Sequence, residues 1–339
     1  MLRRVESGAY ASDLLLHARG LDARDAGLAT EIVFGCLRYQ AQLDYMIARL
    51  TNHRTLDSEV RIVLRMGIYQ MRYLERIPPH AAVSESVDLI KRSGKASAAP
   101  LVNAVLRKVN RNPVNWPDRA TALSCPEWLL EKWERQFGTE TAESMAQAFL
   151  IPPENYVAST GRIQDIGSQS IVPLMDLQAG QSLLDLCAAP GNKTAQALER
   201  GVDVVACDLH LHRLRTMDDL ACRRVALDAT QPLPFARRFD RILVDAPCSG
   251  TGTLARNPEI KWRLREADLK DLQRRQIGIL KNALAGLAPG GRLVYSTCSL
   301  EREENEDVIA AFPGPWQTAR RTPGTDPGDG FFAAVLPSA

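Results

Sequence analysis

Two cysteines follow apolar, β-branched segments that have the composition of buried strands. Cys248 lies in the segment DAPCSGTG after residues 241–244, and Cys298 lies in the segment YSTCS after residues 292–294. The carboxyl ends of parallel strands line a common ligand crevice. Two thiols in one crevice suit a reaction that needs a covalent nucleophile and a second group that handles a proton. The alternative is that both are small hydrophobic residues that end buried strands, which is the usual role of a free cysteine.

A third segment, LLDLCAAPGNKT at residues 183–194, has the pattern of a strand, a turn of small residues and a helix. This pattern opens nucleotide-binding βαβ units, in which small residues let a ligand approach the backbone and the helix start offers free N–H groups. The full G-x-G-x-x-G spacing is absent. The residues that we expect to contact a cofactor here are Cys187, Ala188, Ala189, Pro190, Gly191, Asn192 and Lys193.

Successive predicted strands end in aspartate. Asp208 ends the strand at residues 204–208, about 20 residues beyond the turn, where a ribose-binding carboxylate is expected. Asp228 and Asp245 end the next two predicted strands. A carboxylate at a buried strand end needs a polar partner, and the hydroxyl or amino groups of a cofactor would supply one. We therefore expect all three aspartates at the cofactor site.

With these segments in view, the chain resembles the RsmB/NOP family of RNA cytosine-C5 methyltransferases, within it the bacterial small-subunit rRNA methyltransferase B group (Sun/Fmu). The segments DLCAAPGNKT, DAPCSGTGT and YSTCS carry the resemblance, together with QDIGSQ at residues 164–169 and GDGFF at residues 328–332. The family usually has PGGKT where this chain has Asn192, and asparagine also tolerates positive φ. The resemblance implies a Rossmann-like class I methyltransferase domain with a seven-stranded, mostly parallel sheet and S-adenosylmethionine as cofactor.

The resemblance also implies a mechanism. Carbon 5 of cytosine is a poor nucleophile until a thiolate adds to carbon 6. The residues alone leave open which cysteine attacks, and the family assigns attack to Cys298 and product release to Cys248. Asp245 would then hydrogen-bond the cytosine edge and favour the charge that develops on the base. The implied target is a cytosine of 16S rRNA, at standard position 967.

The first 120 residues read as helices and carry a different charge from the remainder. Apolar residues recur at helical spacing over residues 25–37, 58–73, 80–94 and 98–109. Residues 1–120 hold 18 Lys and Arg against 12 Asp and Glu, a balance of +6, while the whole chain has a net charge of +2. A basic segment suggests contact with phosphate, although a solvated helical surface would have the same composition.

This part resembles the NusB-like RNA-binding domain of the same methyltransferase group, on the segments EIVFGCLR at residues 31–38 and NAVLR at residues 103–107. We expect phosphate contacts at Arg38, Arg107 and Lys108, although each could be a surface charge. The expected domains are residues 1–120, NusB-like and all-α; residues 121–163, a helical linker; and residues 164–339, catalytic. The family has a mixed α/β subdomain before QDIGSQ, whereas only residues 151–161 stand there in this chain, which predicts a reduced substrate-binding surface.

Composition narrows the remaining classes of protein. No apolar stretch reaches membrane-spanning length, the first residues do not form a signal segment, and seven cysteines without CxxC pairs predict neither a metal site nor disulfides. We therefore expect a cytoplasmic monomer without an obligate protein partner, acting on 16S rRNA before the subunit is fully assembled.

Three alternatives remain. The first is a methyltransferase that modifies another rRNA or tRNA site with the same motifs. The second is a non-catalytic RNA-binding assembly factor, which loss of a catalytic cysteine or aspartate would have favoured. The third is a DNA cytosine methyltransferase, which would need a target-recognition domain after Cys298, where 41 residues remain.

Overall fold

The computed structural model describes residues 1–18 and 20–338, and its contacts divide the chain into two compact units. The helical unit consists of Met1–Pro152 together with Leu254–Arg263. The sheet unit consists of Pro153–Thr253 and Leu264–Ala339. The segment Leu254–Arg263, which follows the Cys248 motif in sequence, thus belongs with the N-terminal helices.

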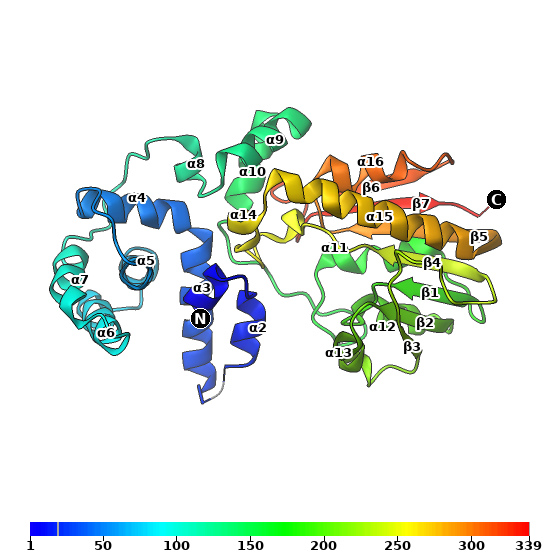
Figure 1. The fold of residues 1–339 in the computed structure, drawn as a ribbon, viewed down its shortest axis with the longest axis horizontal. Coiled ribbons are helices and arrows are strands. Elements are labelled where there is room, and N and C mark those ends of the chain that lie inside the picture. Colours follow the sequence, from blue (N-terminus) through cyan, green and yellow to red (C-terminus); the bar gives the residue numbers. More distant parts are fainter. Residues whose placement is uncertain (19, 339) are drawn as a thin grey trace. The chain divides into compact units, whose positions relative to one another are not determined.

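The helical unit buries the apolar faces of its helices between Leu2 and Leu106 in one core (Figure 1, blue to cyan). Its helices are α1 (Leu2–Glu6), α2 (Ala11–Leu16), α3 (Ala23–Arg38), α4 (Gln40–Leu50), α5 (Ser58–Tyr73), α6 (Pro79–Arg92), η1 (Ala96–Ala98), α7 (Ala99–Leu106), α8 (Arg119–Ala122), α9 (Glu127–Phe137), α10 (Thr139–Ala148) and α14 (Ile260–Arg263). The four helices expected from apolar spacing correspond to α3, α5, α6 and α7. Helix α4 was not predicted, and it has four buried residues: Gln42, Leu43, Met46 and Ile47.

Gly35 occupies a position in the middle of α3 where glycine would ordinarily weaken a helix. A Cβ atom at this position would lie 1.9 Å from the ring of Tyr69. The Tyr69 hydroxyl donates a hydrogen bond of 2.5 Å to Glu31 in α3. Glycine therefore lets α5 pack its tyrosine directly against the α3 backbone.

The segment 254–263 binds the carboxyl end of α3. Trp262 Nε1 donates to the Leu37 carbonyl at 2.7 Å, and Lys261 Nζ donates to the Arg38 carbonyl at 3.0 Å. In return, the Arg38 guanidinium donates two hydrogen bonds, at 3.1 and 2.9 Å, to the Ala255 carbonyl. Burial lowers the pKa of Lys261 to about 8. These bonds fix the segment on the helical unit.

This arrangement corrects the expected role of Arg38. Its side chain was expected to contact phosphate, but the residue is only 4% exposed and its guanidinium binds a protein carbonyl. The basic residue in the EIVFGCLR segment therefore serves packing within the helical unit.

The sheet unit is built on seven strands in the order β3-β2-β1-β4-β5-β7-β6. The strands are β1 (Ser182–Leu186), β2 (Asp203–Asp208), β3 (Arg223–Ala226), β4 (Phe239–Asp245), β5 (Leu287–Thr297), β6 (Gln317–Arg321) and β7 (Phe331–Leu336). The pairs from β3 to β5 are parallel, and β7 is antiparallel to both β5 and β6. The expected seven-stranded, mostly parallel sheet is confirmed. Strand order reverses between β1 and β4, where open parallel sheets bind ligands.

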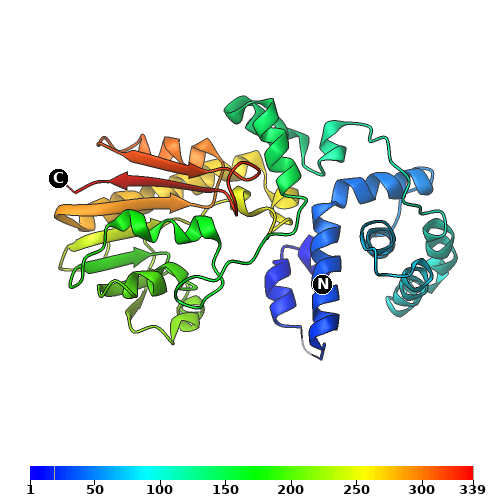
Figure 2. The ribbon, with the colours of Figure 1, turned by 180° about the vertical axis from the view of Figure 1, so that it is seen from behind.

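Helices cover both faces of this sheet, as Figures 1 and 2 show from opposite sides. One face packs against α15 (Glu266–Gly286) and α16 (Glu306–Ile309), with Leu280, Val308 and Tyr295 in the shared core. The other packs against α11 (Ile166–Gln169), α12 (Asn192–Leu198), η2 (Val172–Met175) and α13 (Leu211–Leu214). Strand side chains alternate between the two cores, as Leu183 and Leu184 do.

Two further features of the described residues bear on the predictions. Between Pro153 and Ile163 there is no strand, and only the isolated bridge from Val157 to Ile163 forms. Within residues 1–18 and 20–338, no helix is both long and apolar enough to cross a membrane.

We expect Arg38→Ala to destabilise the protein by roughly 1–3 kcal/mol, because the partly buried Ala255 carbonyl would lose its donors. Urea denaturation of the full chain measures this change. Arg76→Ala, which removes an exposed arginine, is the control and should change stability by less than about 0.5 kcal/mol. Equal stability of the two variants would contradict the packing role of Arg38.

Candidate active site

The two thiols identified from the sequence lie together because their strands are neighbours. Strands β4 and β5 pair in parallel with Asp245 opposite Ser296. Each strand then leads into its cysteine within three residues, so both loops start from the same edge. The Sγ atoms of Cys248 and Cys298 are 3.4 Å apart.

The environment of the two thiols distinguishes them. The hydrogen bond with Cys298, then burial, and then the charge of nearby groups including Glu304 raise the pKa of Cys248 well above its usual value. Cys248 is therefore favoured as a thiol. Either sulfur can donate in the hydrogen bond that joins the two thiols.

Backbone contacts between three segments hold the cysteine loops. Gly252 N donates to the Cys298 carbonyl at 2.9 Å, and Gly330 N donates to the Gly252 carbonyl at 2.8 Å. A Cβ atom on Gly252 would lie 2.4 Å from the Gly330 oxygen. Glycine is therefore required where the DAPCSGTG, TCS and GDGFF segments cross.

Asp245 is joined to the small-residue turn by a lysine. Lys193 Nζ donates to Asp245 Oδ2 at 2.7 Å, and Ser296 Oγ donates to Asp245 Oδ1 at 2.9 Å. Lys193 is 9% exposed, and its Nζ lies 5.4 Å from the centre of the Phe331 ring. Lys193, which was expected to contact a cofactor, is thus an internal cation. The Asp245 side chain remains 30% exposed, so that it can still reach a ligand.

A cavity of about 460 Å³ opens at the carboxyl ends of β1 and β2. Three residues expected to bind the cofactor line it, namely Cys187, Asp208 and Asp228. Its other lining residues are Cys207, Leu209, His210, Arg213, Leu227, Ala229, Thr230, Pro247, Arg275 and Ile279. The remaining expected cofactor residues do not line this cavity: Ala188, Ala189, Pro190, Gly191, Asn192, Lys193 and Asp245. The loop residues among them shape the turn, in which Gly191 N donates to the Ala188 carbonyl at 2.8 Å and Gly191 has a φ of 97°.

Asp208 fits a hydroxyl-bearing ligand in this cavity. The residue is 3% exposed, and its Oδ1 accepts a hydrogen bond from His210 N at 2.9 Å. Its Oδ2 accepts no hydrogen bond from the described residues, although Arg213 lies 3.4 Å away. A buried carboxylate oxygen without a donor is costly, and a ribose hydroxyl would supply one. Asp228, in contrast, is exposed, and its carboxylate already binds the Thr230 hydroxyl and amide.

Four further polar residues at the site were not predicted: Asp185, Ser249, Ser299 and Glu304. Asp185 is buried under the turn and accepts a hydrogen bond from Thr194 Oγ1 at 2.6 Å. Ser249 and Ser299 each follow one of the cysteines, and both donate to the buried carboxylate of Glu304. A buried acid cannot be recognised from its own sequence position, although the DLCAAP and TCS segments contain or adjoin these residues.

The two other expected phosphate contacts are exposed on the helical unit. Lys108 lines a hollow of about 420 Å³ together with Tyr45, Arg49 and Arg72. No carboxylate is among its lining residues. Arg107 lines a separate hollow with His80 and Asn103.

The cysteine, acidic and histidine side chains of the described residues bear on the sequence predictions about disulfides and metal sites. All seven cysteines are free thiols. No group of three or more His, Cys, Asp or Glu side chains in residues 1–18 and 20–338 is placed to hold a metal ion.

Comparison with known proteins gives matches to both units. Residues 172–321 match the family described as 16S rRNA methyltransferase RsmB/F, and residues 2–111 match the NusB family. The chain is 31% identical to the probable ribosomal RNA small subunit methyltransferase B of Bacillus subtilis (strain 168), over 92% of this chain and 86% of the relative. It is 32% identical to ribosomal RNA small subunit methyltransferase B of Enterobacter sp. (strain 638), over 98% of this chain and 95% of the relative.

The fold is also similar to that of a solved structure. The crystal structure of PH0851 has a TM-score of 0.77 at 21% identity, covering 96% of this chain and 93% of that one. The alignments to the two curated relatives run over 383 and 412 positions, more than the 339 residues of this chain. Both relatives therefore contain segments that this chain lacks.

The buried carboxyl of Asp185 leads to a prediction about pH. Burial raises the pKa of Asp185 from 3.8 to about 7, so the folded state holds a proton that the unfolded chain releases at lower pH. The folded protein should therefore lose stability as pH rises through this window. Asp185→Asn keeps an acceptor for Thr194 and has no carboxyl to titrate, so it should not lose this stability. Its free energy of unfolding relative to that of the wild type should therefore be roughly 2–3 kcal/mol more favourable at pH 8 than at pH 5.

Urea denaturation at both pH values measures the difference, and Asp88→Asn is the control. Asp88 is half-exposed and pairs with Lys91 on the surface. The Asp88→Asn variant should differ from the wild type in free energy of unfolding by the same small amount at both pH values. A pH-independent difference for Asp185→Asn would show that Asp185 does not hold this proton.

Proposed function

Because the chain belongs to the family of ribosomal RNA small subunit methyltransferase B, an rRNA methyltransferase that uses S-adenosylmethionine, we propose that it methylates carbon 5 of a cytosine in 16S rRNA. The observation that carries the proposal is the pair of thiols 3.4 Å apart at the ends of neighbouring strands. Transfer to an oxygen or an exocyclic nitrogen would need no such pair, whereas carbon 5 must first be activated by a covalent nucleophile. The proposed target is the cytosine at standard position 967.

In the proposed reaction Cys298 attacks carbon 6 of the cytosine. The thiolate donates an electron pair to carbon 6, and the π electrons of the 5,6 double bond make carbon 5 nucleophilic. The neighbouring Cys248 thiol supports the thiolate by a hydrogen bond, in keeping with its raised pKa. S-adenosylmethionine, when bound, supplies the electrophilic methyl group that carbon 5 takes.

Cys248 is assigned to product release. Cys248, once its own proton has passed to solvent, takes the carbon 5 proton. The electron pair of that C–H bond moves between carbons 5 and 6, and the electron pair of the carbon–sulfur bond returns to Cys298 as a thiolate. The ring then regains its 5,6 double bond. Asp245, which keeps free lone pairs beside Lys193 and Ser296, would accept a hydrogen bond from the cytosine amino group and so orient the base.

The cofactor would lie in the cavity at the ends of β1 and β2. Asp208 is suited to the ribose hydroxyls because its Oδ2 accepts no hydrogen bond within the described chain. Asp228, which also lines the cavity, is proposed to lie near the adenine, while the turn from Cys187 to Lys193 would approach the amino acid portion. The proposed setting is the cytoplasm, where the thiols stay reduced.

Substituting the two cysteines tests this division of labour. Cys298→Ala should abolish methyl transfer and any covalent adduct with RNA. Cys248→Ala should accumulate a protein–RNA adduct that survives denaturation, because attack and transfer proceed while release fails. Denaturing electrophoresis with labelled 16S rRNA fragments measures both, and Cys222→Ala, at a thiol away from the pair, should behave as the wild type. A trapped adduct in Cys298→Ala would reverse the assignment.

The hollow on the helical unit is proposed to contact rRNA phosphates. Arg49 and Lys108 are exposed there, and no carboxylate among the lining residues competes with phosphate for them. The target base must leave its stack, which costs a few kcal/mol that contacts elsewhere must offset. The segment missing relative to the curated relatives would leave more of this binding to the helical unit.

Replacing both Arg49 and Lys108 by alanine should weaken rRNA binding and reduce the slope of log affinity against log salt by roughly two. Filter binding at several salt concentrations measures the slope, while calorimetry should show unchanged S-adenosylmethionine affinity. The control replaces Lys91 and Arg92, two exposed cations outside the hollow, so the change in net charge is the same. Equal slopes for the two double variants would show that the hollow is not a phosphate site.

A further inference from the structure

Glu304 is a fully buried acid beside both cysteine loops. It ends η5 (Arg302–Glu304), five residues after Ser299 of the TCS segment, and its exposure is 0%. Within the described chain no lysine or arginine forms an ion pair with it. A carboxylate in such a position is costly unless hydrogen bonds compensate it.

Four hydrogen bonds converge on this carboxylate. Oε1 accepts from Ser249 N at 2.8 Å and from Gln276 Nε2 at 3.0 Å. Oε2 accepts from Ser299 Oγ at 2.5 Å and also from Ser249 Oγ. Both oxygens thus take two donors.

The donors include the residues that follow the two thiols. Ser249 comes directly after Cys248, and Ser299 comes directly after Cys298. The two serine hydroxyls also lie 3.1 Å from each other. Gln276 extends the contact by donating to the Pro247 carbonyl at 3.0 Å, on the other side of Cys248. One carboxylate therefore binds the backbone or side chains that flank both cysteines.

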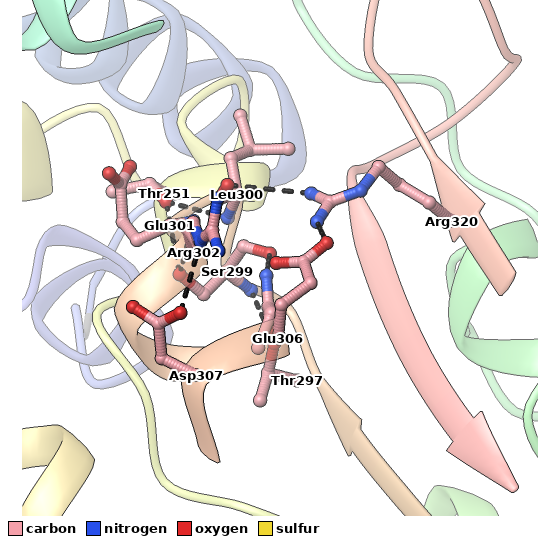
Figure 3. Close-up of polar contacts among 10 residues, drawn as sticks. Thr251, Thr297, Ser299, Leu300, Glu301, Arg302, Glu306, Asp307 and Arg320 are labelled. Carbon is pink, nitrogen blue, oxygen red and sulfur yellow. Dashed lines mark hydrogen bonds and ion pairs between the residues drawn. The ribbon is translucent and has the colours of Figure 1, made fainter. Parts of the chain in front are cut away.

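Glu304 is itself held in place by β5. The hydroxyl of Tyr295, a fully buried residue of that strand, donates to the Glu304 carbonyl at 2.6 Å. The next residue, Asn305, accepts from Thr297 Oγ1 at 2.6 Å and donates to the Ser299 carbonyl at 2.9 Å. Figure 3 shows how closely the neighbouring residues of this turn surround Ser299. The Glu304 carboxylate is thus held in one position and binds both cysteine loops there.

We propose that Glu304 is a positioning residue for the reaction, which sets the separation of the two thiols and the difference in their reactivity. This inference rests on the proposed function, because it assigns different roles to Cys298 and Cys248. The charge of Glu304 also contributes to the raised pKa of Cys248, after the hydrogen bond with Cys298 and burial. The residue does not touch the reacting atoms and acts through the serines.

Glu304→Gln tests the charge with little change in shape. Glutamine keeps one oxygen for the Ser249 amide, and the serine hydroxyls can turn to accept from its amide group. Single-turnover methyl transfer at saturating substrates should fall by about 100-fold, as for a small misplacement of reacting groups. S-adenosylmethionine affinity, measured by calorimetry, should stay within about twofold, well under the 1.4 kcal/mol of a tenfold change.

The second readout needs neither RNA nor turnover. Alkylation of each cysteine by iodoacetamide, followed by peptide mass spectrometry across pH, should show Cys248 reacting at lower pH in Glu304→Gln than in the wild type. Ser299→Ala, which removes one donor from the carboxylate, should change the alkylation rate of Cys298 relative to Cys248. It should also lower the rate of methyl transfer.

Glu306→Gln is the matched control. Glu306 lies two residues away and pairs with Arg320 at 2.5 Å, as Figure 3 shows, and it binds neither serine. It should match the wild type in methyl transfer and alkylation.

Unchanged alkylation profiles in Glu304→Gln would overturn the inference, whatever the methylation rate. Loss of cofactor affinity together with activity would also overturn it, since Glu304 would then serve only the fold. If Cys248→Ala accumulates no adduct with RNA and the wild type transfers no methyl group, the proposed function fails, while the alkylation profiles still decide the role of Glu304.

Discussion

The parallel pairing of β4 with β5 is the constraint on which the rest of the sheet unit depends. Its register places Asp245 opposite Ser296, so the loops that carry Cys248 and Cys298 start at the same height on the same edge. A parallel pair needs a long crossover connection, and the chain between these strands contains both α15 and the segment 254–263. The thiols are therefore adjacent because of strand register, although 50 positions separate them in sequence. The hydrogen bonds of the two cysteine loops then fix the positions of the thiols more closely.

Much of the sheet unit could be predicted from the sequence because its signals are local. Apolar runs ending in aspartate or cysteine mark the strands, and the small residues around Gly191 mark the turn. The seven-stranded sheet followed from the family resemblance of these motifs. Their chemistry is carried by residues within a few positions of each strand end, which is where a parallel sheet places its ligands.

The parts that escaped prediction depend on contacts between distant segments. The sequence around Arg38 is typical of a basic surface residue. Arg38 is a buried hydrogen-bond donor only because Ala255, from a distant segment, packs against the end of α3. Glu304 sits in an acidic stretch, EREENED, that has the composition of a solvated turn. Its burial follows from the donors that Ser249 and Gln276 bring from elsewhere in the chain. Charge counts cannot distinguish a solvated acid or base from one that is satisfied internally.

The position of the segment Leu254–Arg263 in the chain has a consequence for folding during synthesis. N-terminal domains usually fold first during synthesis, but this segment completes the helical unit and is made after all four strands from β1 to β4. Until it emerges, the carboxyl end of α3 lacks the partners of its last carbonyl groups, those of Leu37 and Arg38. The N-terminal helices would therefore lack this segment while strands β1 to β4 have already left the ribosomal exit tunnel. The helical unit can therefore complete its folding only after much of the sheet unit has been synthesised.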